Sequence, residues 1–142
     1  MTDLTDYARL VAADHGLATV ATLRADHTIQ ASLVNTGVLD HRGHQVVGFT
    51  TAGAHKLANL RARPRFAVTI RAGWEWVTAE GDAELIGPDD PAEGFDAEAI
   101  RLLLRAVFVA AGGTHDDWAS YDRVMAEERR AAVLMSPVRV YG

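Results

Sequence analysis

Short segments in which residues of different character alternate follow one another closely along this chain. The segment "LATVATL" covers residues 17–23. Its residues fall into two alternating sets: Leu17, Thr19, Ala21 and Leu23 in one, and Ala18, Val20 and Thr22 in the other. A period of two is typical of a β-strand. Polar turns such as "RADHT" and "HRGH" separate it from two further segments rich in β-branched residues. Because these segments are short and adjacent in sequence, they favour an antiparallel sheet or small barrel over a doubly wound parallel sheet.

Two short helices are expected in the first half of the chain. Residues 5–13 carry an apolar stripe, with Thr5 as the expected cap and Gly16 as a left-handed stop. Residues 54–62 form the second, which ends before Pro64 because the residue preceding a proline avoids the α region.

A pair of helices is expected at about residues 96–128. The first begins at Asp96 and has apolar residues at helical spacing until Gly112. The second follows Thr114, which forms a near capping box with Asp117. The predicted order is helix, three strands, short helix, two strands, two helices and one strand, with "TIQASLVNTGVLD" as the second strand. We expect residues 1–142 to form a single domain.

Composition and charge exclude several classes of protein. A hydrophobic content of 49% and a charged content of 23% are typical of a globular chain. The absence of cysteine excludes disulfides and thiolate metal sites, and a net charge of −5 argues against a broad nucleic-acid surface. No signal-peptide pattern and no apolar run of about 20 residues is present, so we expect a cytoplasmic protein without membrane partners.

The segment "FTTAGAHKLANLRARP" contains Lys56, the only lysine among the 14 Lys and Arg residues. A strand ending at Thr50 and Thr51 is followed by Gly53 and then by the start of a helix. Free backbone N–H groups and the positive end of the helix dipole favour an anion there, and the hydroxyls and His55 add donors. The segment therefore predicts a phosphate site, and the alternative is a capped surface helix with a solvated lysine.

Other constellations give weaker signals. His41 and His44 flank an apparent turn and lack a third ligand, so we predict surface histidines and no metal site. No nucleophile or acid–base pair emerges, so catalytic residues stay unassigned and a bound cofactor would carry any chemistry. Trp74 and Trp76 are interpreted as core residues or as an aromatic wall at an interface or over a flat ring.

Several segments in order resemble one known family. "ATVATLRADHTIQASLVNTG" resembles its first hairpin, and "FTTAGAHKLANLRARPRFAVTI" resembles its motif with two threonines, a lysine and an Asn-Leu pair. "WVTAEGDAELI" and "RRAAVLMSPVRVYG" resemble the strands that follow. The chain resembles the flavin and deazaflavin proteins related to pyridoxamine 5′-phosphate oxidase, and within them the actinobacterial branch that uses coenzyme F420.

The resemblance implies a fold and an assembly. The fold is α+β and mainly β: a split β-barrel, which is an antiparallel Greek-key-type barrel with flanking helices, of the FMN-binding split-barrel type. Such proteins are usually homodimers with the cofactor at the subunit interface. The helical pair would pack against the barrel and line the substrate pocket.

The resemblance also implies cofactor-binding residues. Lys56 falls at the family's phosphate lysine, with Thr50, Thr51 and His55 around the same phosphate, and Asn59 matches the motif asparagine. The strand along the ring system would contribute Ser32, Val34 and Asn35, and Trp76 would approach from a neighbouring strand or subunit.

Two departures affect the choice of cofactor. Many relatives place an arginine directly before the lysine or two residues before it, where this chain has His55 and Ala54. An arginine pattern associated with flavin mononucleotide, expected between Ser32 and Val38, is absent.

The expected function is therefore hydride transfer between reduced F420 and a small conjugated or unsaturated acceptor. The alternatives are an FMN-binding oxidoreductase on the same fold and a deazaflavin-binding or carrier protein without turnover.

Overall fold

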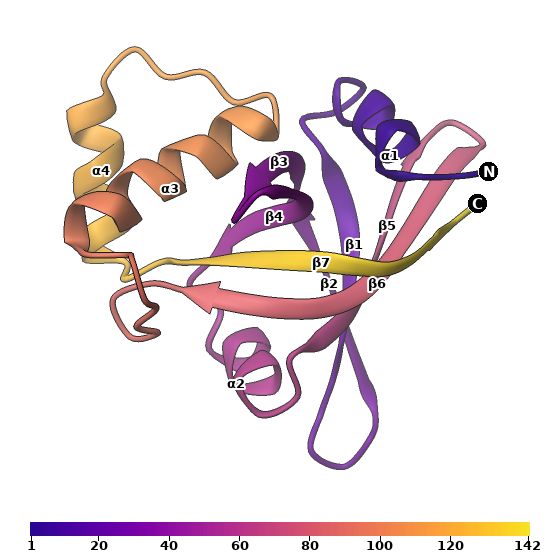
Figure 1. Cartoon of the computed structure of the whole chain (residues 1–142), viewed down its shortest axis with the longest axis horizontal. Helices are drawn as coiled ribbons and strands as arrows, with labels where there is room; N and C mark the ends of the chain where they lie inside the picture. The colour runs from indigo at the N-terminus through magenta and orange to yellow at the C-terminus, as the bar shows by residue number, and fades with distance from the viewer.

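The structure, a computed structural model, describes residues 1–142 as seven strands and four helices (Figure 1). In chain order the elements are α1 (Leu4–Val11), β1 (Leu17–Leu23), β2 (Ile29–Asn35), β3 (Gly37–His41), β4 (His44–Thr51), α2 (Ala54–Ala62), β5 (Arg65–Ala72), β6 (Glu75–Ile86), α3 (Ala97–Ala110), α4 (Trp118–Glu127) and β7 (Ala131–Tyr141).

All seven strands form one antiparallel sheet in the order β2-β1-β5-β6-β7-β4-β3. The sheet curves strongly, and β7 and β6 cross in front of β4 and β1 in Figure 1. β2 and β3 are its two edges and are not hydrogen-bonded to each other, so the sheet is not closed. The mainly β, antiparallel architecture predicted from the alternating segments is confirmed.

The prediction of one strand over "TIQASLVNTGVLD" was wrong, because the chain breaks at Thr36 into β2 and β3. Thr36 is fully buried, and both its backbone N–H and its hydroxyl donate to the carbonyl oxygen of Gly16, at 2.8 and 2.7 Å. The hydroxyl of Tyr7 lies 2.7 Å from the Thr36 hydroxyl. These bonds hold the corner at which the chain passes from one sheet edge to the other.

Two apolar clusters lie on opposite sides of the sheet. The larger one fills the concave side, beneath α1 and α2, and includes Tyr7, Phe49, Leu60 and Val68. The smaller one lies between the outer side of β4 and β7 and the helix α3; its buried members are Val46, Ile86, Leu103, Leu104, Val107, Ala132 and Leu134. Alternation along β4 explains the division, since Phe49 and Val47 face one cluster and Val46 faces the other.

Helix caps differ from those expected. α1 begins one residue earlier than predicted because Asp3, not Thr5, is its cap: the Asp3 carboxylate accepts from the N–H groups of Thr5 and Asp6. α4 is capped by Asp117, which accepts from the N–H of Ser120, and not by Thr114. A carboxylate at either position accepts more strongly than a hydroxyl because it is charged.

The predicted pair of helices is present as α3 and α4. α3 packs across β3, β4 and β7, on the outer side of the sheet (Figure 1). The Asp122 carboxylate of α4 accepts from Arg101 at 3.0 Å and from Arg105 at 2.9 Å, and both arginines are on α3. None of the helices is both long enough and apolar enough to cross a bilayer.

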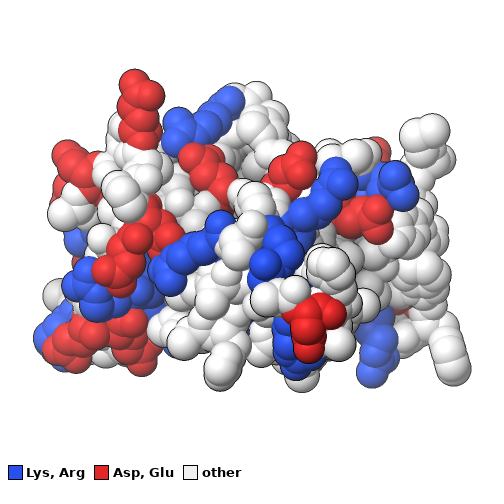
Figure 2. All heavy atoms as spheres, turned by 90° about the horizontal axis from the view of Figure 1, so that it is seen from below, with Lys and Arg blue, Asp and Glu red and all other residues white.

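Charged side chains on the surface are mostly paired. On the face shown in Figure 2, acidic and basic side chains lie next to one another. Arg61 donates to Asp90 and Arg129 donates to Asp89, each through two nitrogen atoms. The buried Lys56, described below, has no such partner.

Candidate functional site

A cavity of about 450 Å³ lies where β4 ends and α2 begins. The edge strand β2 contributes one wall, through Val34 and Asn35. The helices α3 and α4 contribute the opposite wall, through Phe108 and Tyr121 among others. A volume of this size is within the range of small-molecule pockets.

Lys56 lies in the wall of this cavity and is only 9% exposed. Its ammonium group forms no salt bridge and no hydrogen bond in the protein, and lies 5.7 Å from the centre of the Phe49 ring. Every fully buried side-chain nitrogen or oxygen has a hydrogen-bond partner, so the unpartnered ammonium group retains its opening into the cavity. Burial lowers the pKa of Lys56, and the charge of Arg130 lowers it further.

The N-terminus of α2 faces the same cavity. Its cap is Gly53, which has no side chain to accept from the first N–H groups of the helix. The Thr51 hydroxyl accepts from the N–H of Gly53 at 3.0 Å and thereby fixes the turn that leads into α2. Backbone donors at a helix N-terminus, together with a desolvated cation in the first turn of the helix, form a site for an anion.

Arg130 brings a second cation into the cavity and was not predicted from the sequence. The β4–β7 register pairs Thr51 with Ala131, so Arg130 lies next to the end of β4. Its Nε donates to Glu128 at 2.7 Å, while its two Nη groups have no partner. The "RR" before the last strand was a possible signal, but its importance depends on strand pairing, which the sequence does not show.

Comparison with known proteins assigns the fold to a family. Residues 4–140 match the sequence model of the family described as pyridoxamine 5′-phosphate oxidase. The chain belongs to the pyridoxamine 5′-phosphate oxidase family. The resemblance drawn from the sequence segments is therefore confirmed.

Solved structures share this family fold. A conserved hypothetical protein of Mycobacterium tuberculosis, Rv2991, is 21% identical with a TM-score of 0.70 over 99% of this chain and 83% of that one. A protein described as an F420 reductase is 18% identical, with a TM-score of 0.62 over 95% of each chain. An FMN-binding protein of Nostoc punctiforme related to pyridoxamine 5′-phosphate oxidase is 15% identical, with a TM-score of 0.62 over 96% of this chain and 80% of that one. These likenesses support the predicted split β-barrel.

Five of the nine residues predicted from the family resemblance line the cavity: Val34, Asn35, Thr50, Thr51 and Lys56. The other four do not line it in this chain. Ser32 is half-buried in the middle of β2, opposite Val20, and His55 is exposed on α2.

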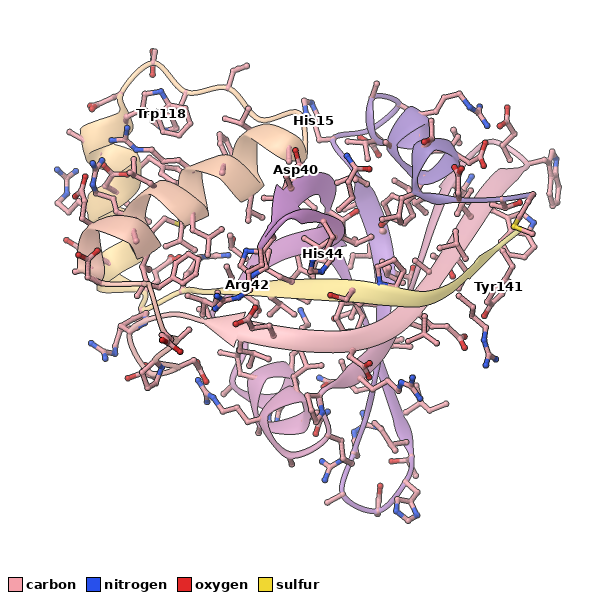
Figure 3. All side chains as sticks on the ribbon, in the orientation of Figure 1. His15, Asp40, Arg42, His44, Trp118 and Tyr141 are labelled. Carbon is pink, nitrogen blue, oxygen red and sulfur yellow. The ribbon has the colours of Figure 1, made fainter.

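Trp76 was predicted to approach the cofactor, but it does not line the cavity that contains Lys56. Trp74 is 99% exposed and Trp76 is 46% exposed, so the interpretation of both as core residues was wrong. Trp76 packs edge to face against Tyr141, at 6.5 Å between ring centres. Tyr141 lies at the opposite end of the molecule from Trp118 of α4 (Figure 3).

The two turn histidines also have defined partners. His41 is buried, and its Nε2 lies 2.7 Å from the Glu84 carboxylate, so the prediction that it is a surface residue was wrong. His44 is exposed and its Nε2 lies 2.8 Å from the hydroxyl of Ser136.

Asn59 is engaged within the protein. Its side-chain amide donates to the Thr22 hydroxyl and to the Gln30 amide oxygen, both at 3.1 Å, and so joins α2 to the first hairpin. We expect Asn59→Ala to lower the free energy of unfolding by about 1–3 kcal/mol, because the buried Thr22 hydroxyl and the half-buried Gln30 amide oxygen lose their donor. Urea unfolding checks this value, with His55→Ala, an exposed position on the same helix, as the control. An effect no larger than that of His55→Ala would contradict the structural role.

Proposed function

We propose that this chain binds coenzyme F420 through Lys56 and the N-terminus of α2, and that it transfers a hydride between the reduced cofactor and a small conjugated or unsaturated acceptor. One observation carries the proposal: Lys56, only 9% exposed and without a protein anion, lines a cavity of ligand size. A buried cation without a counter-ion is unfavourable, and an anionic ligand offsets that cost.

The donors around the cavity fit a phosphate group. Its oxygens accept hydrogen bonds from an ammonium group, from a guanidinium group and from free backbone amides. Lys56, the unpartnered Nη groups of Arg130 and the first N–H groups of α2 supply these three kinds. Arg130 thus supplies the second positive charge that the positions before Lys56 lack.

A bound deazaflavin supplies the hydride, and the residues of the chain position the reactants. Val34 and Asn35, on the edge strand, line the cavity and would lie along the ring system of the cofactor. Phe108 and Tyr121 close the opposite wall with aromatic surface, which excludes water from the reacting groups. The Tyr121 hydroxyl donates to the carbonyl oxygen of Leu104 at 3.0 Å, which fixes the orientation of its ring.

FMN is the alternative cofactor, since it also carries a phosphate group and one structural neighbour is described as FMN-binding. A deazaflavin carrier without turnover is the other alternative. Equilibrium titration of the purified protein with F420 and with FMN separates the two cofactors, and we expect F420 to bind more tightly. Oxidation of reduced F420 across a panel of quinones and enones then separates an enzyme from a carrier. Absence of binding by either cofactor at micromolar concentration would refute the proposal.

We also propose that the protein is a homodimer with the cofactor at the subunit interface. The outer face of β1 and β2 exposes Leu17, Ile29 and Leu33, the last two at 66% and 65%. Trp76 lies on the same outer face. Strand pairing aligns Trp76 with Arg71 of β5, and Thr69, two residues before Arg71, with Thr19 of β1. Thr19 is on the same side of the sheet as Leu17 and Leu33, because paired residues and residues two apart share a face. Leu33 also borders the cavity, so a second copy on this face would complete its wall and bring its own Trp76 to the same surface.

A substitution on this face tests the dimer. We expect the wild-type protein to have twice the mass of the 15.3 kDa chain, and Leu33→Arg to be monomeric because it buries a charge in an apolar contact. Sedimentation equilibrium measures the masses. Leu102→Arg, at a residue of α3 that is 50% exposed, is the matched control and should remain dimeric. A monomeric wild type, or equal effects of the two substitutions, would rule out this interface.

A further inference from the structure

A second cavity, of about 530 Å³, lies beside the first one. Its walls come from the loop of residues 87–95, from α3 and from α4. The loop folds back on itself through bridges between Gly87 and Asp90 and between Ala92 and Phe95, which shape the outer wall. Of the residues assigned to the cofactor, only Arg130 lines this second cavity.

Most of the wall of this second cavity is apolar. Phe95 and Pro91 come from the loop, Ile100 and Leu104 from α3, and Met125 from α4. Met125 also lines the first cavity, so the two spaces share part of a wall. An apolar pocket with a few convergent polar groups is the usual form of a small-molecule site.

The charged groups around the second cavity are paired, but Arg130 is paired through only one of its nitrogen atoms. Arg101 donates to Asp122, and Arg129 donates to Asp89. Arg130 uses only its Nε, toward Glu128, and keeps two Nη groups without a partner. Its side chain is 31% exposed, so the free end of the guanidinium group is partly desolvated. Two guanidinium nitrogens with free hydrogen-bond donors therefore border an apolar space.

We propose that the second cavity binds a small apolar organic carboxylate. The apolar body of the ligand lies between Phe95, Ile100 and Met125, and its carboxylate accepts hydrogen bonds from the Nη groups of Arg130. A single anionic group fits best, because Asp122 lines the cavity and Glu128 contacts Arg130, so a second anionic group would meet a carboxylate. This site does not depend on the cofactor proposal, although the shared Arg130 would couple the two ligands.

Octanoate and its neutral analogue octanamide are suitable probes, with binding to the full chain measured by isothermal titration calorimetry. We expect octanoate to bind wild type with a dissociation constant of about 1 mM or tighter. Ala126→Phe adds bulk at an exposed position of α4 that lines the cavity, and should weaken octanoate at least about tenfold. Ala119→Phe, at an exposed position of the same helix outside the cavity, should leave binding unchanged.

Arg130→Gln tests the polar contact. It should weaken octanoate about tenfold and octanamide less than about twofold, because only the carboxylate loses a charge-assisted hydrogen bond. Lys56→Ala, which affects the first cavity, should leave octanoate binding within about twofold of wild type. Circular dichroism and thermal melting verify that each variant is folded, and Ile100→Trp gives a second way to fill the cavity.

Three results would overturn the proposal: no binding of octanoate to wild type, equal effects of Ala126→Phe and Ala119→Phe, or loss of octanoate binding in Lys56→Ala. Equal weakening of both probes by Arg130→Gln would refute the assignment of the carboxylate. Failure of F420 and FMN to bind would leave these results unaffected, so the two proposals fail separately.

Discussion

Replacing Lys56 with alanine is expected to weaken cofactor binding about 100-fold, because charge-assisted hydrogen bonds contribute about 1.5–3 kcal/mol each. The loss should be similar for F420 and FMN, since both would use the same phosphate contact. Fluorescence titration with each cofactor measures it. The matched control is Arg61→Ala. Arg61 is a cation on the same helix, but it pairs with Asp90 outside the cavity, so this variant should bind both cofactors normally.

The same position should affect stability in the opposite direction. Lys56→Met keeps the apolar bulk of the side chain and removes a buried cation that has no counter-ion, so the free protein should become more stable at neutral pH. If Lys56→Met destabilised the free protein and left cofactor affinity unchanged, Lys56 would be a structural residue and the phosphate site would be wrong.

The pH dependence follows from the lowered pKa of Lys56, which burial and then the charge of Arg130 bring below the ordinary value of 10.5. Between the lowered pKa and 10.5 the unfolded chain binds more protons, so the contribution of Lys56 to stability rises with pH in that window. A bound phosphate group favours the charged form of Lys56. The affinity of the protein for the cofactor should therefore fall as the pH rises through the lowered pKa of Lys56. The pH dependence of stability in Lys56→Met separates the contribution of Lys56 from that of Tyr7, whose pKa is raised by burial.

The sequence predicted the strands and helices well where the signal is local. Alternation predicted the sheet, and the spacing of apolar residues predicted α3 to within a residue at its start. The break at Thr36 was missed because its cause is a set of hydrogen bonds to Gly16, twenty residues earlier in the chain. No periodicity within the segment itself records a contact of that kind.

The candidate site divides in the same way. Thr50, Thr51 and Lys56 lie close together in sequence, so a strand followed by a helix was enough to predict them as neighbours. Arg130 reaches the cavity only through the pairing of β7 with β4, and Tyr121 only through the packing of α4 on α3. The family resemblance implied that the helical pair lines the pocket, but the sequence did not show which of its residues face the cavity.

The close contact between β3 and α3 should make Gly37→Ala strongly destabilising. A Cβ atom at Gly37 would lie 2.3 Å from the carbonyl carbon of Ala110 and 2.6 Å from the nitrogen of Ala111, and both are backbone atoms. The end of α3 would therefore have to move away from the sheet, at a cost of about 2–3 kcal/mol in the free energy of unfolding. Urea unfolding measures this cost.

The displacement should also reach the cofactor cavity, because Phe108 and Ala111 of the same segment line it. We expect weaker cofactor binding in Gly37→Ala even under conditions in which the variant is fully folded. Gly43→Ala is the control: it lies in a turn with nothing within 4 Å, and only its φ of +85° disfavours the substitution. That strain should cost about 1 kcal/mol and leave cofactor affinity unchanged. If Gly37→Ala cost no more than Gly43→Ala and bound cofactor normally, the contact between β3 and α3 would not hold the wall of the cavity in place.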